Sequence, residues 1–250
     1  MAIEVSEEAG VRYLHFGSSW IQGAMRIARP WSLELEYTRA MMLPLLLRPG
    51  AQWPREVLTV GVGAASLIKF IYRNLPRARQ HAVEIDARVV TAARQFFRLP
   101  DEDPPRLSVQ IADADDYVAR AQRSFDLVLV DGFDARGHAG ALDTLRFYRR
   151  VRARLSTRGM LCVNLLGRTR GHRQSVARLA EAFDARVLSL PPCEGGNVVA
   201  VAAEGERVDL GFDELRRGAA KLRRDAGLNL LPLVAQLTAT QVGSGDKLLL

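Results

Sequence analysis

The sequence is poor in cysteine and in lysine. Cys162 and Cys193 are the two cysteines among 250 residues, and they do not form a CxxC pair. We therefore expect neither a disulfide framework nor a metal site. Lysine occurs three times, so the net charge of +7 is carried almost wholly by arginines scattered along the chain. The densest arginine segment, 146–152, fits a solvated helix face, and we expect no nucleic-acid partner.

Long hydrophobic runs are also missing. No segment approaches the roughly 18 continuous apolar residues that a membrane-spanning helix needs. The apolar run 41–47 is much shorter and lies between Arg39 and Arg48, which favours a buried core helix. The first residues are acidic and do not resemble an export signal, which has a basic region followed by an apolar one. We therefore expect a cytoplasmic protein with no membrane partner.

From about residue 49 onward, apolar segments typical of strands alternate with helical segments. This alternation predicts a Rossmann-like α/β fold, in which helices cover both faces of a parallel sheet and two antiparallel strands complete it. The expected strands are 56–60, 80–85, 107–111, 125–130, 159–165, 185–190 and 197–202. The expected helices are 65–75, 87–97, 117–121, 142–155, 174–183 and a C-terminal helical segment, 212–237, with a polar tail after it.

The residues before this alternation have a different pattern. Two β-like pieces, 11–16 and 23–27, are separated by Gly17-Ser18-Ser19 and predict a short hairpin. A helical pattern follows over 36–47 and ends at Pro49-Gly50. We therefore expect two units, an N-terminal β-hairpin with a linking helix over 1–48 and a Rossmann-like catalytic domain over 49–250.

The turn after the first expected strand of this domain contains Gly61 and Gly63. Glycines permit a tight turn and close approach of a ligand, although such a turn also needs glycine for packing alone. Glu84 ends the second strand, where an acid can accept hydrogen bonds from both hydroxyls of a ribose. The combination predicts an adenosine-containing nucleotide at Gly61, Gly63 and Glu84. The alternative is that Glu84 and Asp86 only cap the next helix.

Acids also follow the third and fourth strands. Asp113-Ala114 comes after the third strand, where a carboxylate can accept a hydrogen bond from an adenine amino group or, alternatively, cap a helix. Asp131 and Asp134 follow the most apolar strand, 125–130. A charge in that position is costly unless a ligand or donor meets it, so we expect the reactive group there.

These motifs and their spacing resemble the spermidine synthase (aminopropyltransferase) family over about residues 37–201. The resemblance implies a methyltransferase-type sheet, a homodimer or homotetramer, and decarboxylated S-adenosylmethionine as co-substrate, with an amine as acceptor and no metal. By this resemblance Glu84 would hold the ribose and Asp113 the adenine. Asp131 would help to deprotonate the amine, and Asp134 and Tyr37 would line its pocket. Exposed apolar residues of the hairpin could form the subunit interface, namely Trp20, Ile21 and Trp31.

The sequence departs from the family pattern on the amine side of the site. Ala64 stands where the family has an acid that grips the aminopropyl group, and Gly132-Phe133 replaces paired serines. Arg39 is a cation near the expected amine, and the aromatic loop of the family is replaced by 191–197. Two alternatives therefore stay open: an S-adenosylmethionine-dependent methyltransferase and a non-catalytic homologue. What lies beside Ala64 is expected to separate the two transferases.

Overall fold

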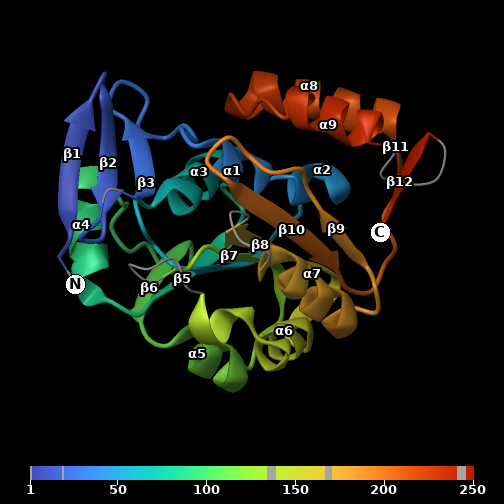
Figure 1. Ribbon diagram of the computed structural model, residues 1–250, viewed down its shortest axis with the longest axis horizontal. Helices are drawn as coiled ribbons and strands as arrows, with labels where there is room; N and C mark the ends of the chain where they lie inside the picture. The colour runs from blue at the N-terminus through green and yellow to red at the C-terminus, as the bar shows by residue number, and fades with distance from the viewer. Residues whose placement is uncertain (1, 19, 134–138, 167–170, 241–245) are drawn as a thin grey trace.

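The computed structural model describes residues 2–18, 20–133, 139–166, 171–240 and 246–250. Its centre is a seven-stranded sheet with the strand order β6-β5-β4-β7-β8-β10-β9. A three-stranded antiparallel sheet, β1-β2-β3, lies to one side, and a pair of strands, β11-β12, lies near the C-terminus (Figure 1). The expected Rossmann-like α/β fold is therefore confirmed.

The first five strands in this order, β6, β5, β4, β7 and β8, are parallel to one another. β10 runs antiparallel to both of its neighbours, β8 and β9. The strand order reverses between β4 and β7, which creates the switch point where ligands bind in sheets of this kind. The strands are β4 (Glu56–Val60), β5 (Arg79–Glu84), β6 (Leu107–Ile111), β7 (Phe125–Val130), β8 (Leu155–Leu166), β9 (Val187–Ser189) and β10 (Asn197–Ala203).

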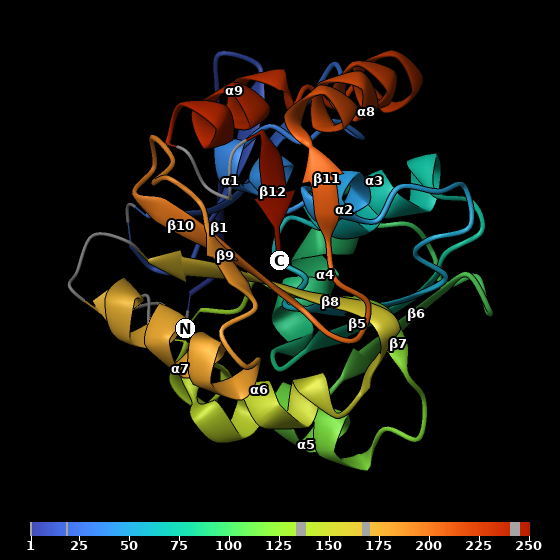
Figure 2. The same cartoon turned by 90° about the vertical axis from the view of Figure 1, so that its right-hand side faces the viewer.

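Successive residues of β7 face opposite sides of the sheet, as the period of two in a strand requires. Leu127 and Leu129 pack in one core with helices of residues 36–47, 66–74 and 212–239, whereas Val128 and Val130 pack in the other core with helices of residues 114–120 and 145–182. Figure 2 shows these two helix layers above and below the sheet. The connecting helices are α3 (Ser66–Asn74), α4 (Ala87–Phe97), α5 (Ala114–Arg120), the 3₁₀ helix η1 (Gly140–Asp143), α6 (Leu145–Arg152) and α7 (Gly171–Ala182).

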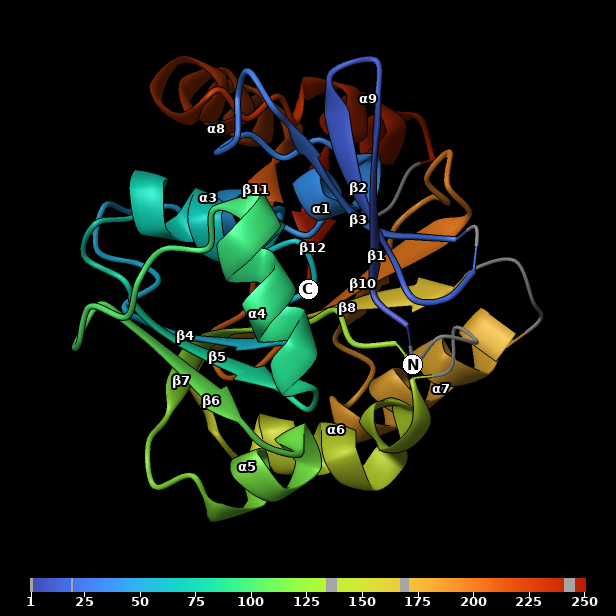
Figure 3. The same cartoon turned by 90° about the vertical axis from the view of Figure 1, so that its left-hand side faces the viewer.

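The N-terminal region forms a sheet of three strands, one more than the two-stranded hairpin that the sequence predicted. The sheet consists of β1 (Glu4–Glu8), β2 (Val11–His15) and β3 (Ile21–Arg26). β1 is largely exposed and acidic, so it lacks the apolar alternation that marks a half-buried strand. Figure 3 shows this sheet near α4, and side chains of both contribute to one apolar cluster.

The single helix expected over 36–47 is wrong, because two short helices occupy that region. They are α1 (Glu36–Ala40) and α2 (Pro44–Leu47). Pro44 lacks a backbone N–H and therefore starts α2 instead of continuing α1. The apolar run 41–47 is buried as expected.

The C-terminal helical segment is likewise divided in two. α8 (Phe212–Ala226) ends at Gly227, whose φ of 67° lies in the left-handed region, and α9 (Leu231–Ala239) follows. The polar tail contains a strand that the sequence did not predict, because β12 (Lys247–Leu249) pairs with β11 (Asp209–Gly211). None of the helices in the described ranges is long and apolar enough to cross a membrane.

The arginines of the segment 146–152 form ion pairs with acids, of which Asp115 is buried. Arg146 and Arg150 both contact Asp115, at 2.8 and 2.7 Å. Arg149 pairs with Glu181, and Arg152 pairs with Asp184 and Glu204. This segment is therefore a helix face with internally compensated charge.

Candidate active site

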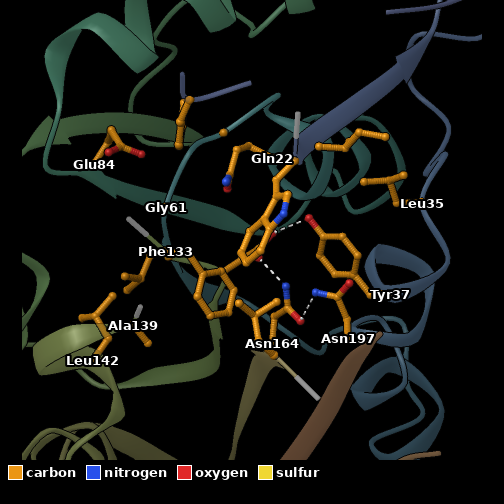
Figure 4. Close-up of a pocket in the computed structure, with 18 of the residues that line it drawn as sticks. Gln22, Leu35, Tyr37, Gly61, Glu84, Phe133, Ala139, Leu142, Asn164 and Asn197 are labelled. Atoms are coloured by element: carbon orange, nitrogen blue, oxygen red, sulfur yellow. Dashed lines mark hydrogen bonds between the residues drawn. The ribbon is translucent and has the colours of Figure 1, made fainter. Parts of the chain in front are cut away.

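A pocket of about 1030 Å³ opens at the carboxyl ends of the central parallel strands. The predicted site residues Tyr37, Gly61, Gly63, Glu84, Asp113, Ala114 and Asp131 all line it. Asp134, also predicted, lies outside the described residues. The fold thus brings to one pocket residues that are far apart in the sequence, and Figure 4 shows Tyr37, Gly61 and Glu84 around it. The individual roles of these residues remain predictions.

The turn after β4 has a shape that requires glycine. Gly61 has a φ of 89°, and a Cβ atom added there would lie 2.2 Å from the carbonyl oxygen of Asp131. Gly63 also has a positive φ, of 49°. The first glycine therefore permits close contact between the ends of β4 and β7, in addition to the turn itself.

Glu84 is tied to this turn by its carboxylate. Oε2 accepts a hydrogen bond from the backbone N–H of Val62 at 2.9 Å, and Oε1 accepts one from Asp86 N–H at 3.1 Å. Each carboxylate oxygen can accept a second hydrogen bond, so the group is held in place with acceptor capacity left for ribose hydroxyls. Asp86 accepts from Arg88 N–H and is the N-cap of α4. The cap therefore does not depend on Glu84.

Asp113 caps α5, which is the alternative that the sequence left open. Its Oδ1 accepts hydrogen bonds from the backbone N–H groups of Asp115 and Asp116, at 2.7 and 3.3 Å. It also lines the pocket, next to the buried Ala114 that begins the helix. Capping uses one oxygen of the carboxylate, so the same side chain can still accept a hydrogen bond from a ligand.

Asp131 is held by two donors from different elements. Tyr37 Oη donates to Oδ2 at 3.1 Å, and Asn164 Nδ2 donates to Oδ1 at 2.8 Å. The Asn164 side-chain oxygen accepts in turn from Asn197 Nδ2 at 3.0 Å (Figure 4). Desolvation raises the pKa of the Asp131 carboxyl, although the hydrogen bonds from Asn164 and Tyr37 act in the opposite direction. The site therefore contains a carboxylate that accepts a proton more readily than an exposed aspartate does.

The sequence reasoning missed Asn164 and Asn197. Asn164 lies in β8 and is buried, and Asn197 begins β10. A polar residue near the end of an otherwise apolar strand was the available signal, because buried amides need hydrogen-bond partners.

Ala64 is buried against the N-terminal sheet. A Cβ atom added at Gly23 of β3 would lie 2.6 Å from the Cβ of Ala64, so the two backbones approach closely. Ser66 Oγ adds a hydrogen bond to the carbonyl oxygen of Ala24 at 3.2 Å. Two residues of β3 line the pocket, Ile21 and Gln22, and Figure 4 shows Gln22 on the side of the pocket where Gly61 and Glu84 lie.

Further charged residues line the pocket at α1. Glu34 pairs with Arg26 at 2.5 Å, and Glu36 Oε2 accepts from the backbone N–H of Glu194 at 2.7 Å. Arg39 also lines the pocket, and its guanidinium donates to the carbonyl oxygens of Leu33 and Glu34. The cation expected near the amine is therefore present, but backbone carbonyls hold it.

Both cysteines are free and buried. Burial raises the pKa of the Cys193 thiol to about 11, and it raises the pKa of Cys162 as well. Both thiols therefore stay protonated near neutral pH, which fits packing rather than nucleophilic roles. Among the described residues, no group of three or more His, Cys, Asp or Glu side chains is arranged to hold a metal ion.

Comparisons with known proteins agree with this architecture. The chain is 35% identical to the polyamine aminopropyltransferase of Chromobacterium violaceum, over 99% of this chain and 94% of the relative. It is 33% identical to that of Neisseria meningitidis, over 97% and 91%. A probable spermidine synthase from Corynebacterium glutamicum has the same fold, with a TM-score of 0.71 and 18% identity, over 99% of this chain and 86% of that one.

A methyltransferase is also among the similar structures. Human methyltransferase-like protein 13 in complex with SAH has a TM-score of 0.66 and 26% identity, over 77% of this chain and 92% of that one. The family model of the spermine/spermidine synthase domain matches residues 34–183, from α1 to the end of α7. Together with the full-length relatives, this match confirms the resemblance found in the sequence: the chain belongs to the spermine/spermidine synthase family.

Proposed function

We propose that the protein transfers the aminopropyl group of decarboxylated S-adenosylmethionine to an amine. The observation that carries this proposal is the position of Asp131. Its carboxylate, with a raised pKa and hydrogen bonds from Tyr37 and Asn164, lies in the same pocket as Gly61 and Glu84. A proton acceptor and a nucleotide site in one pocket are what aminopropyl transfer requires.

The co-substrate fits the β4–β5 side of the pocket. Glu84 has acceptor capacity left for the ribose, and Gly61 and Gly63 line this side of the pocket without side chains. Asp113 and Ala114 would meet the adenine at the end of β6. The aminopropyl chain would then extend toward the end of β7, where the acceptor enters.

Asp131 would supply the proton chemistry. An amine attacks only when its nitrogen is neutral, and the raised pKa of Asp131 makes this carboxylate a more effective base. The nitrogen forms a bond to the aminopropyl carbon while the carbon–sulfur bond breaks. Methylthioadenosine leaves, and the proton from nitrogen passes to Asp131. Holding both substrates in line in one pocket lowers the entropic part of the barrier.

The test is the release of methylthioadenosine from decarboxylated S-adenosylmethionine in the presence of a panel of diamines and polyamines. We expect turnover by the wild-type protein and a fall of about 10²-fold or more for Asp131→Asn. Asp116→Asn, on the exposed side of α5, is the matched control and should retain wild-type turnover. Absence of methylthioadenosine with every acceptor would overturn the proposal.

A methyltransferase is the second candidate, and the observation that favours it is Ala64. A neutral residue there does not repel the carboxylate that S-adenosylmethionine carries and its decarboxylated form lacks. Calorimetric titration with the two co-substrates side by side separates the candidates. Tighter binding of S-adenosylmethionine, with methyl transfer to an acceptor, would favour the methyltransferase. A non-catalytic homologue would bind nucleotide but show no turnover, either as wild type or as Asp131→Asn.

A cytoplasmic location and a homodimer or homotetramer belong to the same proposal. Trp20 and Ile21 are 45% and 49% exposed, which supports a contact surface near the N-terminal sheet, whereas Trp31 is half-buried. Light scattering during size-exclusion chromatography measures the assembly. A monomer at micromolar concentration would contradict this part.

A further inference from the structure

The hydrogen bonds that hold Asp131 continue past Asn164 to Asn197, the first residue of β10. Asn164 Nδ2 donates to Asp131 Oδ1 at 2.8 Å, and Asn197 Nδ2 donates to Asn164 Oδ1 at 3.0 Å (Figure 4). Leu166 is the direct partner of Asn197 in the pairing of β8 with β10, so Asn164, two residues before Leu166, lies on the same face of the sheet as Asn197. The pairing of two distant strands thus brings the second amide to the first.

The two ends of the Asn164 amide have different partners. An ionised carboxylate only accepts hydrogen bonds, so the NH2 group of Asn164 faces Asp131. The carbonyl oxygen of the amide then points to Asn197 and needs a donor there. Asn164 is 3% exposed, so bulk water does not reach the amide to replace either partner. The NH2 group of Asn197 is therefore the donor that completes the hydrogen bonding of this buried side chain.

A half-turn of the Asn164 amide would reverse its contact with the base. The carbonyl oxygen would take the place of Nδ2, 2.8 Å from Asp131 Oδ1, and two acceptors would face each other. At the other end, the NH2 group of Asn164 would meet the NH2 group of Asn197. Asn197 therefore adds a second cost to the reversed orientation, since both contacts would lose their hydrogen bonds in a buried place.

The backbone of Asn197 is held by the loop before it. Its carbonyl oxygen accepts a hydrogen bond from Cys193 N–H at 2.8 Å, and Gly196 N–H donates to the carbonyl oxygen of Cys193 at 2.8 Å. The same loop is tied to α1, because the backbone N–H of Glu194 donates to Glu36 Oε2 at 2.7 Å. The Asn197 side chain therefore extends toward Asn164 from a fixed position.

We propose that Asn197 is a positioning residue for the transfer reaction: it holds the Asn164 amide in the orientation whose NH2 group faces Asp131. This role rests on the proposed function, in which Asp131 is the base, and Asn197 acts on the base through Asn164. Desolvation raises the pKa of the Asp131 carboxyl, and the donor on Oδ1 opposes that rise. By keeping the donor in place, Asn197 keeps the base ionised to a lower pH.

Titratable groups from several elements surround Asp131. Tyr37 of α1 donates to Oδ2, and burial raises the pKa of the Cys162 thiol in β8, which stays protonated. Asp134 lies outside the described residues. The charged side chains that line the same pocket are Glu34, Glu36, Arg39, Glu84, Asp113 and Glu194. A test that alters only the two asparagines leaves all these groups in place, so a difference between variants reports on the amides.

The test is a double-mutant cycle on the pKa of the Asp131 carboxyl, followed by ¹³C NMR, with Asp131→Asn to identify the resonance. Leucine has nearly the shape of asparagine but donates no hydrogen bond. Asn197→Leu should raise this pKa by about 0.5 and Asn164→Leu by about 1, because the donor on Oδ1 is weakened or removed. The variant with both changes should match Asn164→Leu, since Asn197 acts through Asn164.

Asn74→Leu is the matched control. Asn74 donates to the carbonyl oxygen of Phe70 within α3, and its loss should leave the pKa of Asp131 unchanged. An unchanged pKa in Asn197→Leu would overturn the proposal. A rise in Asn197→Leu that persists in full on the Asn164→Leu background would also overturn it, because Asn197 would then act without Asn164. Circular dichroism checks folding, and Asn164→Ala takes the place of Asn164→Leu in the cycle if the leucine variant is unfolded.

The NMR titration needs no turnover, so the role of Asn197 and the proposed function can fail separately. If wild type releases methylthioadenosine, the acidic limb of kcat/KM should move to higher pH in Asn197→Leu by the amount that the pKa rises. If wild type is active but the pKa does not respond to Asn197→Leu, only the role of Asn197 fails. If no acceptor supports release, the proposed function fails, and the titration still decides whether Asn197 orients Asn164.

Discussion

The phenol oxygen of Tyr37 lies 3.1 Å from Oδ2 of Asp131, although the two residues are 94 positions apart in the sequence. The hydrogen bond joins α1, at the start of the family-matched region, to the end of β7. It stabilises the ionised form of the carboxylate, while desolvation disfavours that form. The pKa of the proposed base is therefore adjusted from outside the central sheet.

Tyr37→Phe should move the acidic limb of the pH profile to higher pH. Removal of the donor raises the pKa of Asp131 further, so the ionised base is lost at a higher pH as the solution is acidified. We expect a shift of about one pH unit in kcat/KM. Tyr72→Phe is the matched control, since Tyr72 Oη donates to Asp103 on the surface. A Tyr37→Phe profile that superimposes on wild type would show that the bond does not tune the base.

Gly23→Ala should destabilise the protein and weaken co-substrate binding. The new methyl group would overlap Ala64, whose Cβ would be 2.6 Å away, so either β3 or the glycine turn must shift. Overpacking of this kind costs about 1–3 kcal/mol in the free energy of unfolding. Urea denaturation and nucleotide titration measure the two effects. Adding Ala64→Gly to the variant should restore part of both losses, and a double variant no better than Gly23→Ala would locate the clash elsewhere.

Arg98→Gly should stabilise the protein. Arg98 ends α4 with a φ of 56°, and its side chain is exposed. Glycine adopts this left-handed conformation without the penalty of a Cβ atom, so we expect a gain of about 1 kcal/mol. Arg94→Gly, inside the same helix, should instead cost about 1 kcal/mol. Thermal unfolding compares the two, and a loss of stability in Arg98→Gly would contradict the expectation.

Lys69 should make stability depend on pH. Its ammonium is buried in α3 and donates to the carbonyl oxygen of Phe97 at 2.7 Å, and burial lowers its pKa from 10.5 to about 7. Below pH 7 the lysine is charged in both states, and the folded state bears the full desolvation cost. Between pH 7 and 10.5 the unfolded chain binds a proton that the folded chain lacks, so this cost is progressively removed as pH rises.

The measurement is the difference in unfolding free energy between Lys69→Met and wild type at several pH values. From pH 7 to 9.5 it should change by about 1 kcal/mol per pH unit in favour of wild type. Contributions from other titrating groups cancel in this difference. Lys221→Met, at an exposed ion pair on α8, should show no such slope. A flat difference for Lys69→Met would mean that the amine stays charged in the folded protein.

The central sheet was predictable because its strands are apolar and end in distinctive residues. The bounds expected for β4, α4, β6 and β7 match the structure. The rule that ligands bind at strand ends pointed to Glu84 and Asp131, and both line the pocket. β1 was not predictable from pattern, because its acids leave no buried face. Asn164 stood out only as a polar residue in an apolar strand, and its contact with Asn197 was missed because that contact depends on the long-range antiparallel register of β8 and β10.

The contact between Gly61 and the carbonyl oxygen of Asp131 limits which changes of sequence the site can accept during evolution. The glycine turn and the proposed base end two adjacent strands, β4 and β7, so their separation is fixed by the strand spacing of about 4.8 Å. The length of chain between them has no influence on it. Insertions or deletions at the amino ends of the strands, between α3 and β5 or between α4 and β6, would therefore leave the distance between the glycine turn and Asp131 unchanged. A single side chain at position 61 would alter this distance.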